Sequence, residues 1–466
     1  MAPSADPLLP LPVDTNHTPP SQPAVPAQEI EIEIDRNGNE FKSRNSSPLK
    51  KSGVLDAAFE FEDVTPVIGR EYPKARIVED ILGAENADEL IRDLAVTISE
   101  RGVVFFRAQT SLTDDLQKEL ILRLGALTGR PPTSTVHIHP TLNNTNEFGV
   151  SDAEISTISS LHRKKSYFTP ERQSLRRNTK ATEASWHSDI QFEEVPADYT
   201  SLRLVELPES GGDTLWASGE CCSFRFMLSC TALSSWFRWT CLDWKGLRPR
   251  LFVYLPNLSK TLLPSKCYKK AALTTLTPTG YDIYDRFSAP YQRLFDSLTA
   301  TYSGEGFLKA VASGRAKLYT GARGSPLNTG GKLSAVHPLV RTNPVTGWKS
   351  VFGIGNFPKY INELDPEESE ELLARLYRVI EGNHDLQCRF KWRNRNDIAI
   401  WDNRSAFHSA TFDYEGLGER AGHRVVGIGE KPYFDPESKS KAQALAEEAA
   451  AKEAAVGKGR EGDVAA

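Results

Sequence analysis

The chain has 466 residues, of which 39% are apolar and 25% are charged, so it can bury a sizeable core. Its formal net charge of -5 argues against nucleic acid as its main partner. No run of about 18 or more uncharged apolar residues appears, and the N-terminus lacks the basic and then apolar order of a secretion signal. We therefore expect no membrane span, no secretion and a cytoplasmic location.

The two ends differ in composition from the middle of the chain. Residues 1–54 begin with a stretch dominated by Pro, Ser, Ala and Asn and continue with polar residues, which predicts a disordered tail. Residues 437–466 are rich in Ala, Glu and Lys, which predicts a second tail that forms a frayed, solvated helix. Residues 55–436 are then one large domain.

Within this domain, helical and strand periodicities alternate. Apolar residues recur at helical spacing in 86–100, 114–127 and 365–380, the last of which follows an Asp-Pro-Glu-Glu start. Short apolar segments predict strands, among them 102–106, the pair around the Asn-Pro-x-x-Gly turn at 343–347, and the segments 390–392 and 397–401. Many short strands with helices mainly on the N-terminal side predict a mainly β fold with flanking helices, a double-stranded β-helix of the jelly-roll type.

The chemistry begins at His187-Ser188-Asp189. A histidine and a carboxylate two residues apart on one strand point to the same side, so both can reach one ion. His-x-Asp alone has little specificity, but a third ligand, His408, follows far downstream. Two histidines and one carboxylate on one face of an octahedron leave three positions open, which is typical of non-haem Fe(II) oxygenases.

A second group of residues indicates a 2-oxo acid cosubstrate. An oxygenase that splits O2 needs two further electrons, which a metal-bound 2-oxo acid supplies by losing CO2. The far carboxylate of such an acid suits a guanidinium and a hydroxyl. Thr214, in the segment Pro-Glu-Ser-Gly-Gly-Asp-Thr-Leu-Trp, and Arg420, twelve residues after His408, have this chemistry.

Two long blocks carry a resemblance to a known family. WHSDIQFEEVPADYTSLRLVELPESGGDTLWASG and NDIAIWDNRSAFHSATFDYEGLGERAGHRVVGIGEKPYF resemble the two signature regions of the taurine dioxygenase family of Fe(II)/2-oxoglutarate-dependent oxygenases, and are most similar to its fungal sulfonate dioxygenase branch. The resemblance runs from about Phe59 to about Pro436, apart from one segment. It implies a double-stranded β-helix, Fe(II) and 2-oxoglutarate. The residues that it implies are His187, Asp189 and His408 for the metal, Thr214 and Arg420 for 2-oxoglutarate, and Arg424, His139 and Phe352 for the substrate.

The resemblance also implies a reaction. The enzyme would use O2 to hydroxylate the carbon next to sulfur in an alkyl sulfonate such as taurine, releasing sulfite, an aldehyde, succinate and CO2. A sulfate-ester or aryloxyacetate oxygenase with the same site stays open, as does a barrel that has lost catalysis. The partners are a small sulfonate and O2, without nucleic acid or membrane, and a homo-oligomer is left open.

Several assignments have a structural alternative. Arg424 could be a second structural arginine, and Phe352 could belong to the core. His137 and His337 could be ligands, but we interpret the first as a polar wall residue and the second as packing against the barrel. Asp402 more readily serves a turn, since the metal already has an acid.

Two departures from the family pattern bear on the substrate. Leu142 replaces the family's aromatic residue in the His-Pro loop, and Glu183 stands roughly where the family has a small amide. A carboxylate would repel an anionic ligand. Glu183 therefore meets an amine, such as that of taurine, or turns outward.

Residues 220–280 interrupt the family pattern. They hold five of the six cysteines, three of the eight tryptophans and nine Lys or Arg residues against two acids. The cysteines lack the paired spacing of a zinc module, and a disulfide-bonded lid would need an oxidising compartment. We prefer the hypothesis that the segment is a translated, retained intron, because the family-like sequence stops at Gly219 and continues at Tyr281 as if nothing lay between them.

Overall fold

A computed structural model describes residues 47–141, 150–162, 186–218 and 282–462. The predictions for residues 1–46, Leu142, Glu183 and the segment 220–280 therefore lie outside the described residues. Among the residues that the structure describes, no helix is both long and apolar enough to cross a membrane.

The domain extends slightly beyond its expected N-terminal boundary. The backbone N–H of Leu49 donates to the carbonyl of Val345 at 2.8 Å. The N–H groups of Ser52 and Gly53 donate to the Asp93 carboxylate at 2.7 and 2.8 Å. Leu49, Ser52 and Gly53, which we expected in the tail, are therefore hydrogen-bonded to the domain.

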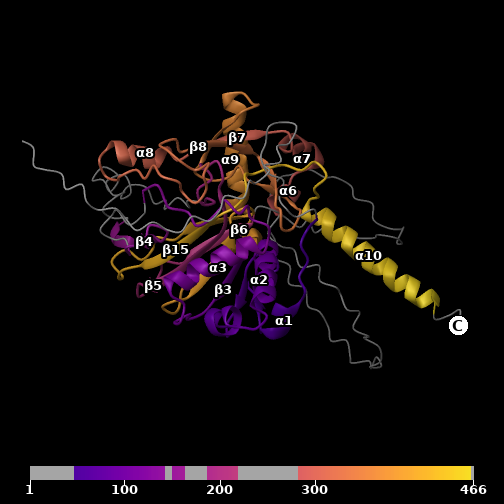
Figure 1. The fold of residues 1–466 in the computed structure, drawn as a ribbon. Coiled ribbons are helices and arrows are strands. Elements are labelled where there is room, and N and C mark those ends of the chain that lie inside the picture. The colour runs from indigo at the N-terminus through magenta and orange to yellow at the C-terminus, as the bar shows by residue number, and fades with distance from the viewer. Residues whose placement is uncertain (1–46, 142–149, 163–185, 219–281, 463–466) are drawn as a thin grey trace, which may run out of the picture. The chain divides into compact units, whose positions relative to one another are not determined.

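A seven-stranded sheet forms the larger layer of the domain (Figure 1). Its neighbouring strands run antiparallel except for one parallel pair, β2 with β3. In spatial order the strands are β1 (Glu62–Asp63), β2 (Arg70–Tyr72), β3 (Val103–Phe106), β13 (Ile398–Asp402), β5 (Ala197–Glu206), β15 (Ala421–Ile428) and β4 (Ser156–Ser159).

A three-stranded sheet packs against the larger one. Its order is β12 (Gln387–Phe390), β6 (Thr214–Ser218) and β14 (Ala406–Ala410), all antiparallel. Side chains from both sheets form one buried cluster, in which Phe105 of β3 stacks on Phe390 at 4.1 Å between ring centroids and meets Trp216 edge-on at 5.3 Å. The main core therefore lies between two facing sheets, as in a jelly roll.

Helices cover the other face of the large sheet. Successive strand residues point to opposite faces, so Val104 and Phe106 leave the intersheet core and join a second buried cluster with α2 (Ala87–Arg101) and α3 (Asp114–Ala126). Figure 1 shows both helices beside the large sheet. The predicted helices at 86–100 and 114–127 and the strand at 102–106 are thus confirmed, with ends that differ by one or two residues.

The remaining elements surround these two sheets. A three-stranded sheet has the order β11-β7-β8, and β9 pairs with β10 around the predicted turn. Their bounds are β7 (Thr299–Ser303), β8 (Ser334–Pro338), β9 (Val340–Thr342), β10 (Lys349–Val351) and β11 (Pro358–Ile361). The helices are α1 (Val54–Ala58), η1 (Ile77–Leu82), α6 (Asp282–Asp285), α7 (Ala289–Phe295), α8 (Glu305–Ala312), α9 (Pro366–Gly382), η2 (His384–Leu386) and α10 (Lys441–Gly462).

The fold class predicted from the sequence is confirmed: the domain is a double-stranded β-helix with flanking helices. One local expectation is wrong. His187 forms only a single bridge, and the chain turns from Asp189 onward, so His187 and Asp189 do not share a regular strand.

Candidate metal centre

Two histidines from distant parts of the sequence lie side by side. His187 and His408 form an antiparallel bridge, in which His187 N donates to His408 O at 3.1 Å and His408 N donates to His187 O at 2.9 Å. Their ring centroids are 4.3 Å apart. His408 lies in the middle of β14, so the small sheet fixes its position and the bridge fixes His187 against it.

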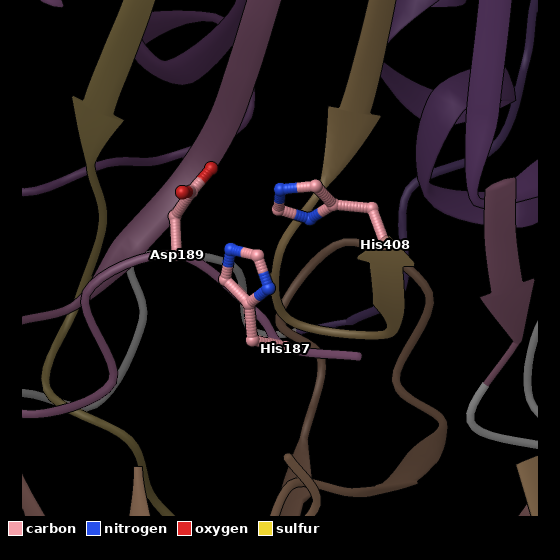
Figure 2. A group of neighbouring side chains, drawn as sticks. All are labelled: His187, Asp189 and His408. Atoms are coloured by element: carbon pink, nitrogen blue, oxygen red, sulfur yellow. The ribbon is translucent and has the colours of Figure 1, made fainter. Parts of the chain in front are cut away.

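Asp189 reaches the same point through a turn rather than along a strand. Ile190, the next residue, has a φ of +48°, which β-branched residues rarely adopt. The strain is offset by hydrogen bonds to Asn403, whose side-chain oxygen accepts from Asp189 N at 3.0 Å and whose carbonyl accepts from the Ser188 hydroxyl at 2.7 Å. The turn therefore directs the carboxylate toward the two imidazoles (Figure 2).

The structure brings together the three residues that the sequence singled out for a metal. One potential ligand atom from each of His187, Asp189 and His408 lies within 4.8 Å of the others. Asp189 Oδ2 and His408 Nδ1 are buried and have no hydrogen-bond partner among the described residues. A buried carboxylate oxygen left unsatisfied close to two imidazoles is expected where an ion binds.

The charge states also suit a cation. Burial and the neighbouring His187 ring lower the pKa of His408 to about 3, so its imidazole is neutral and can act as a ligand. Burial alone would raise the pKa of Asp189, but Coulombic interactions, first of all with Arg424, lower it. An anionic Asp189 carboxylate and a neutral His408 imidazole fit a divalent ion such as Fe(II).

Arg424 lies at the metal centre itself. It projects from β15, is 9% exposed, and donates from Nη1 to Asp189 Oδ1 at 2.6 Å. Its Nε has no hydrogen-bond partner among the described residues. Arg424 thus brings a cation with spare donor capacity beside the carboxylate of the candidate metal site.

His139 lies in the wall of this region. It is 2% exposed, and burial together with the charge of Arg424 holds its pKa well below the ordinary range. Its Nδ1 accepts from Thr141 N at 3.1 Å, and its ring meets Phe307 edge-on at 5.0 Å. A neutral histidine with an apolar neighbour can contact a ligand without adding charge.

Thr214 and Arg420 form a second polar group. Arg420 immediately precedes β15 and Thr214 begins β6, and Arg420 Nη2 donates to Thr214 Oγ1 at 3.2 Å. Arg420 Nε donates to the carbonyl of Gly212 at 2.8 Å. Gly212 has a φ of +72°, and a Cβ there would lie 2.9 Å from Arg420 Cδ. Glycine at this position therefore leaves the space that the arginine occupies.

Phe352 and Phe357 occupy different environments. Phe352 is 1% exposed and packs in the intersheet core, 5.5 Å from the Tyr302 ring. Phe357 is partly buried and its ring lies 6.1 Å from that of His187. Phe357 also contacts Phe192 and Phe307, at 5.1 and 6.3 Å. The resemblance implied Phe352 for the substrate, with core packing as its alternative, whereas Phe357 was not singled out from the sequence.

The other candidate ligands lie in polar networks of their own. His337 contacts the carbonyls of Gln191 and Glu193 through Nε2, at 3.1 and 2.9 Å. His137 lies 3.3 Å from Glu193, which also pairs with buried Arg323.

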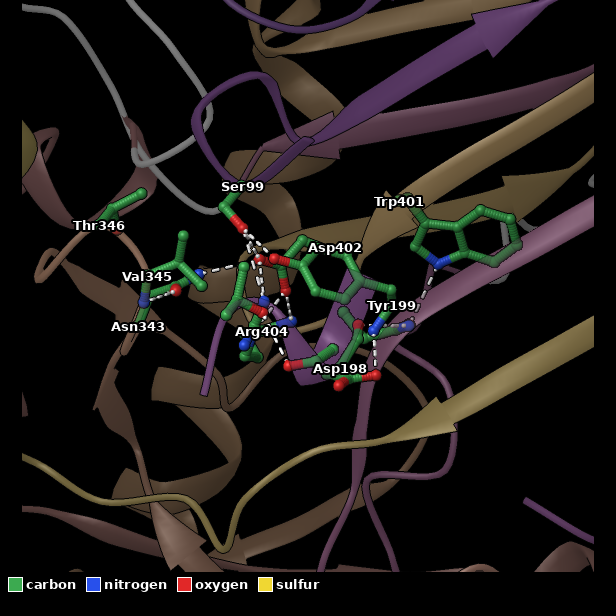
Figure 3. A network of polar contacts seen from close by, with 12 residues as sticks. Ser99, Asp198, Tyr199, Asn343, Val345, Thr346, Trp401, Asp402 and Arg404 are labelled. Atoms are coloured by element: carbon green, nitrogen blue, oxygen red, sulfur yellow. Dashed lines mark hydrogen bonds and ion pairs between the residues drawn. The ribbon is translucent and has the colours of Figure 1, made fainter. Parts of the chain in front are cut away.

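Asp402 accepts from the backbone N–H and the guanidinium of Arg404 and from the Ser99 hydroxyl (Figure 3). The bond to the backbone two residues ahead is the turn interaction that the sequence predicted for Asp402.

Asn403 is the main functional-site residue that the sequence did not single out. Besides Asp189 N, its Oδ1 accepts from Trp401 Nε1 at 3.1 Å, and its Nδ2 donates to Thr200 Oγ1 at 2.7 Å. A buried amide between the two metal-site segments can align them. In the sequence, the feature that could have indicated Asn403 is its place in the turn between the predicted strand 397–401 and His408.

These features are typical of metal-dependent oxygenases with two histidines and one carboxylate. Sequence comparison gives the family. Residues 60–220 and 275–426 match the sequence model described as "Taurine catabolism dioxygenase TauD, TfdA family". The chain belongs to this family and is an alpha-ketoglutarate-dependent, that is 2-oxoglutarate-dependent, dioxygenase.

Curated relatives agree with this assignment. The chain is 40% identical over 415 residues to alpha-ketoglutarate-dependent dioxygenase esdpJ of Penicillium shearii, covering 88% of this chain and 99% of the relative. It is 39% identical over 399 residues to dioxygenase oryG of Aspergillus oryzae, covering 86% and 96%. The alpha-ketoglutarate-dependent sulfonate dioxygenase of Saccharomyces cerevisiae is 24% identical over 406 residues, covering 85% and 75%.

Proposed function

We propose that His187, Asp189 and His408 bind Fe(II) and that Thr214 and Arg420 bind the distal carboxylate of 2-oxoglutarate. The observation that carries the proposal is the approach of three potential ligand atoms within 4.8 Å, two of them from buried residues. With O2 and 2-oxoglutarate, the bound iron supplies the oxidising chemistry for hydroxylation of a substrate C–H bond.

The protein's own groups orient the cosubstrate and the substrate. Arg420 is 3% exposed and fixed by Gly212, so it offers a pre-positioned cation to the distal carboxylate. Arg424 offers a cation to an anionic substrate from beside the metal carboxylate. His139 lines the same region as a neutral group, with the ring of Phe307 against it and that of Phe357 beside Phe307.

We infer that the substrate is a sulfonate. The support is Arg424, whose planar donors suit a strong oxyanion, together with the sulfonate dioxygenase among the relatives. Hydroxylation of the carbon next to sulfur gives an unstable adduct. Its hydroxyl loses a proton, a C=O bond forms, and the C–S bond breaks with its electron pair leaving on sulfite. The other products are succinate and CO2.

An aryloxyacetate is the second candidate substrate. The observation that favours it is the aromatic cluster of Phe192, Phe307 and Phe357, which reaches the His187 ring. An aromatic body could pack against these rings while its carboxylate meets Arg424. Hydroxylation of the carbon that carries the ether oxygen would then release a phenol.

A substrate panel separates these possibilities. The full chain, loaded with Fe(II), is given 2-oxoglutarate, O2 and in turn taurine, longer alkyl sulfonates, a sulfate ester and an aryloxyacetate, and succinate, sulfite, sulfate and phenol are measured. Sulfite formed with a sulfonate, in a one-to-one ratio with succinate, supports the main proposal. Phenol without sulfite supports the second candidate, and no substrate-dependent succinate with any compound contradicts both.

A further inference from the structure

The hydroxyl oxygen of Thr214 accepts two hydrogen bonds. The indole N–H of Trp392 donates to Thr214 Oγ1 at 3.1 Å, and Arg420 Nη2 donates to the same oxygen at 3.2 Å. Both are obligate donors, because neither an indole nor a guanidinium N–H can accept. The Thr214 oxygen has two lone pairs, so both are engaged.

Only the hydrogen of the Thr214 hydroxyl is then left. No hydrogen bond donated by this hydroxyl is found among the described residues. Thr214 is 2% exposed, so the hydroxyl cannot turn freely to solvent. A buried hydroxyl with both lone pairs occupied can add only one further partner, and that partner must be an acceptor.

We propose that Trp392 is a positioning residue for the cosubstrate: its indole N–H fixes the Thr214 hydroxyl as a donor toward the distal carboxylate of 2-oxoglutarate. The proposal rests on the assignment of Thr214 and Arg420 to this carboxylate. Trp392 itself acts through Thr214. Two donors aimed at a carboxylate, Thr214 and Arg420, reject a 2-oxo acid that lacks this group more strongly than one donor does.

The position of Trp392 suits this role. It lies just beyond β12 and is 6% exposed, and its ring packs edge-on against Phe390 at 4.9 Å. Trp216 is its natural control, since the two rings are 6.5 Å apart in the same core and Trp216 Nε1 has no hydrogen-bond partner among the described residues. Replacing either by Phe removes a similar volume, but only Trp392→Phe removes a hydrogen bond.

The test compares two ligands. The full chain is loaded with redox-inert Zn(II), and the dissociation constants of 2-oxoglutarate and of 2-oxopentanoate, which has the same chain length without the distal carboxylate, are measured by calorimetry. We expect Trp392→Phe to weaken the binding of 2-oxoglutarate by about 3- to 10-fold, the net effect of one neutral hydrogen bond, and to leave the binding of 2-oxopentanoate unchanged. Trp216→Phe changes neither.

Two further variants keep the result decisive. Thr214→Val keeps both donors and removes their acceptor, and we expect it to lose the same preference for the distal carboxylate. In the Thr214→Val background, Trp392→Phe should have no additional effect on the ratio of the two constants. The inference is overturned if Trp392→Phe weakens the binding of both ligands equally. It is also overturned if Thr214→Val leaves the ratio of the two dissociation constants unchanged. Failure of the wild-type chain to prefer 2-oxoglutarate would instead contradict the proposed function.

Discussion

Replacing Asn403 by Ala tests whether one buried amide aligns the two halves of the metal centre. Its Oδ1 accepts from Asp189 N and Trp401 Nε1, and its Nδ2 donates to Thr200 Oγ1 and, at 3.2 Å, to the carbonyl of Asp198. The substitution leaves two buried N–H donors without an acceptor, at about 1–3 kcal/mol each. We expect the free energy of unfolding to fall by about 3–5 kcal/mol, allowing for partial relaxation.

The metal affinity distinguishes alignment from general stabilisation. Because Asp189 loses a bond that orients its turn, we expect the dissociation constant for Fe(II) to rise by about 10- to 100-fold. Asn343 is the matched control: it is equally buried, and its amide donates to Asp402 and accepts from Val345 N. Asn343→Ala should destabilise the fold without this loss of metal affinity.

The assay measures denaturant unfolding of the metal-free chain and anaerobic Fe(II) binding for both variants. Equal Fe(II) affinity in Asn403→Ala and the wild type would refute the reasoning, even if stability fell as expected. An equal loss of Fe(II) affinity in Asn343→Ala would also refute it, because the effect would then follow from lost stability alone.

Three further predictions concern the cosubstrate, the substrate and residues 220–280. In steady-state kinetics, Arg424→Ala should raise the KM for the substrate and leave the KM for 2-oxoglutarate unchanged. An equal increase in both KM values would contradict the assignment of Arg424 to the substrate and Arg420 to 2-oxoglutarate. Gly212→Ala should raise the KM for 2-oxoglutarate by about 10-fold, because the new Cβ displaces Arg420 and breaks its hydrogen bond to the Thr214 hydroxyl. An unchanged KM for 2-oxoglutarate would contradict this role of Gly212. Deleting residues 220–280 should retain or improve 2-oxoglutarate-dependent turnover and thermal stability, and an inactive or unfolded product would defeat the retained-intron hypothesis.

The residues on both sides of segment 220–280 support the retained-intron hypothesis. The match to the family omits residues 221–274. Asp282 N donates to Ser218 Oγ at 3.4 Å, so the described residues that flank the segment lie next to each other. Residues 219–221, Gly-Glu-Cys, can be encoded with the bases GTGAGT, and residues 278–280, Pro-Thr-Gly, with ACAG, which are common intron boundaries. Sequencing of the mature transcript tests the hypothesis directly, and an abundant message that encodes 220–280 contradicts it.

The sequence predicted the strands and helices whose apolar spacing follows from burying one face in the core. Helix α2 and strand β3 follow from regular apolar spacing, and His187, Asp189 and His408 follow from the chemistry of a three-ligand site. The turn at Asp189 could not be predicted, because it depends on Asn403 from a distant segment. Periodicity likewise says nothing of which aromatic side chain approaches His187, so Phe357 was found only in the structure.

Residues joined only by the tertiary fold form the other unpredicted group. Trp392 reads in the sequence as a strand residue of the core, and its hydrogen bond to Thr214 depends on the pairing of β12 with β6. The ion pair between Arg424 and Asp189 depends in the same way on where β15 lies beside the metal-site turn. Pairwise side-chain contacts between such distant segments are not encoded in local spacing.

Anaerobic titration of the metal-free chain with Fe(II), for the wild type and for His408→Ala, measures whether His187, Asp189 and His408 act together. The wild type should bind one Fe(II) per chain, and the variant should lose most of the affinity while remaining folded. Undiminished binding of Fe(II) by folded His408→Ala would contradict the three-ligand centre.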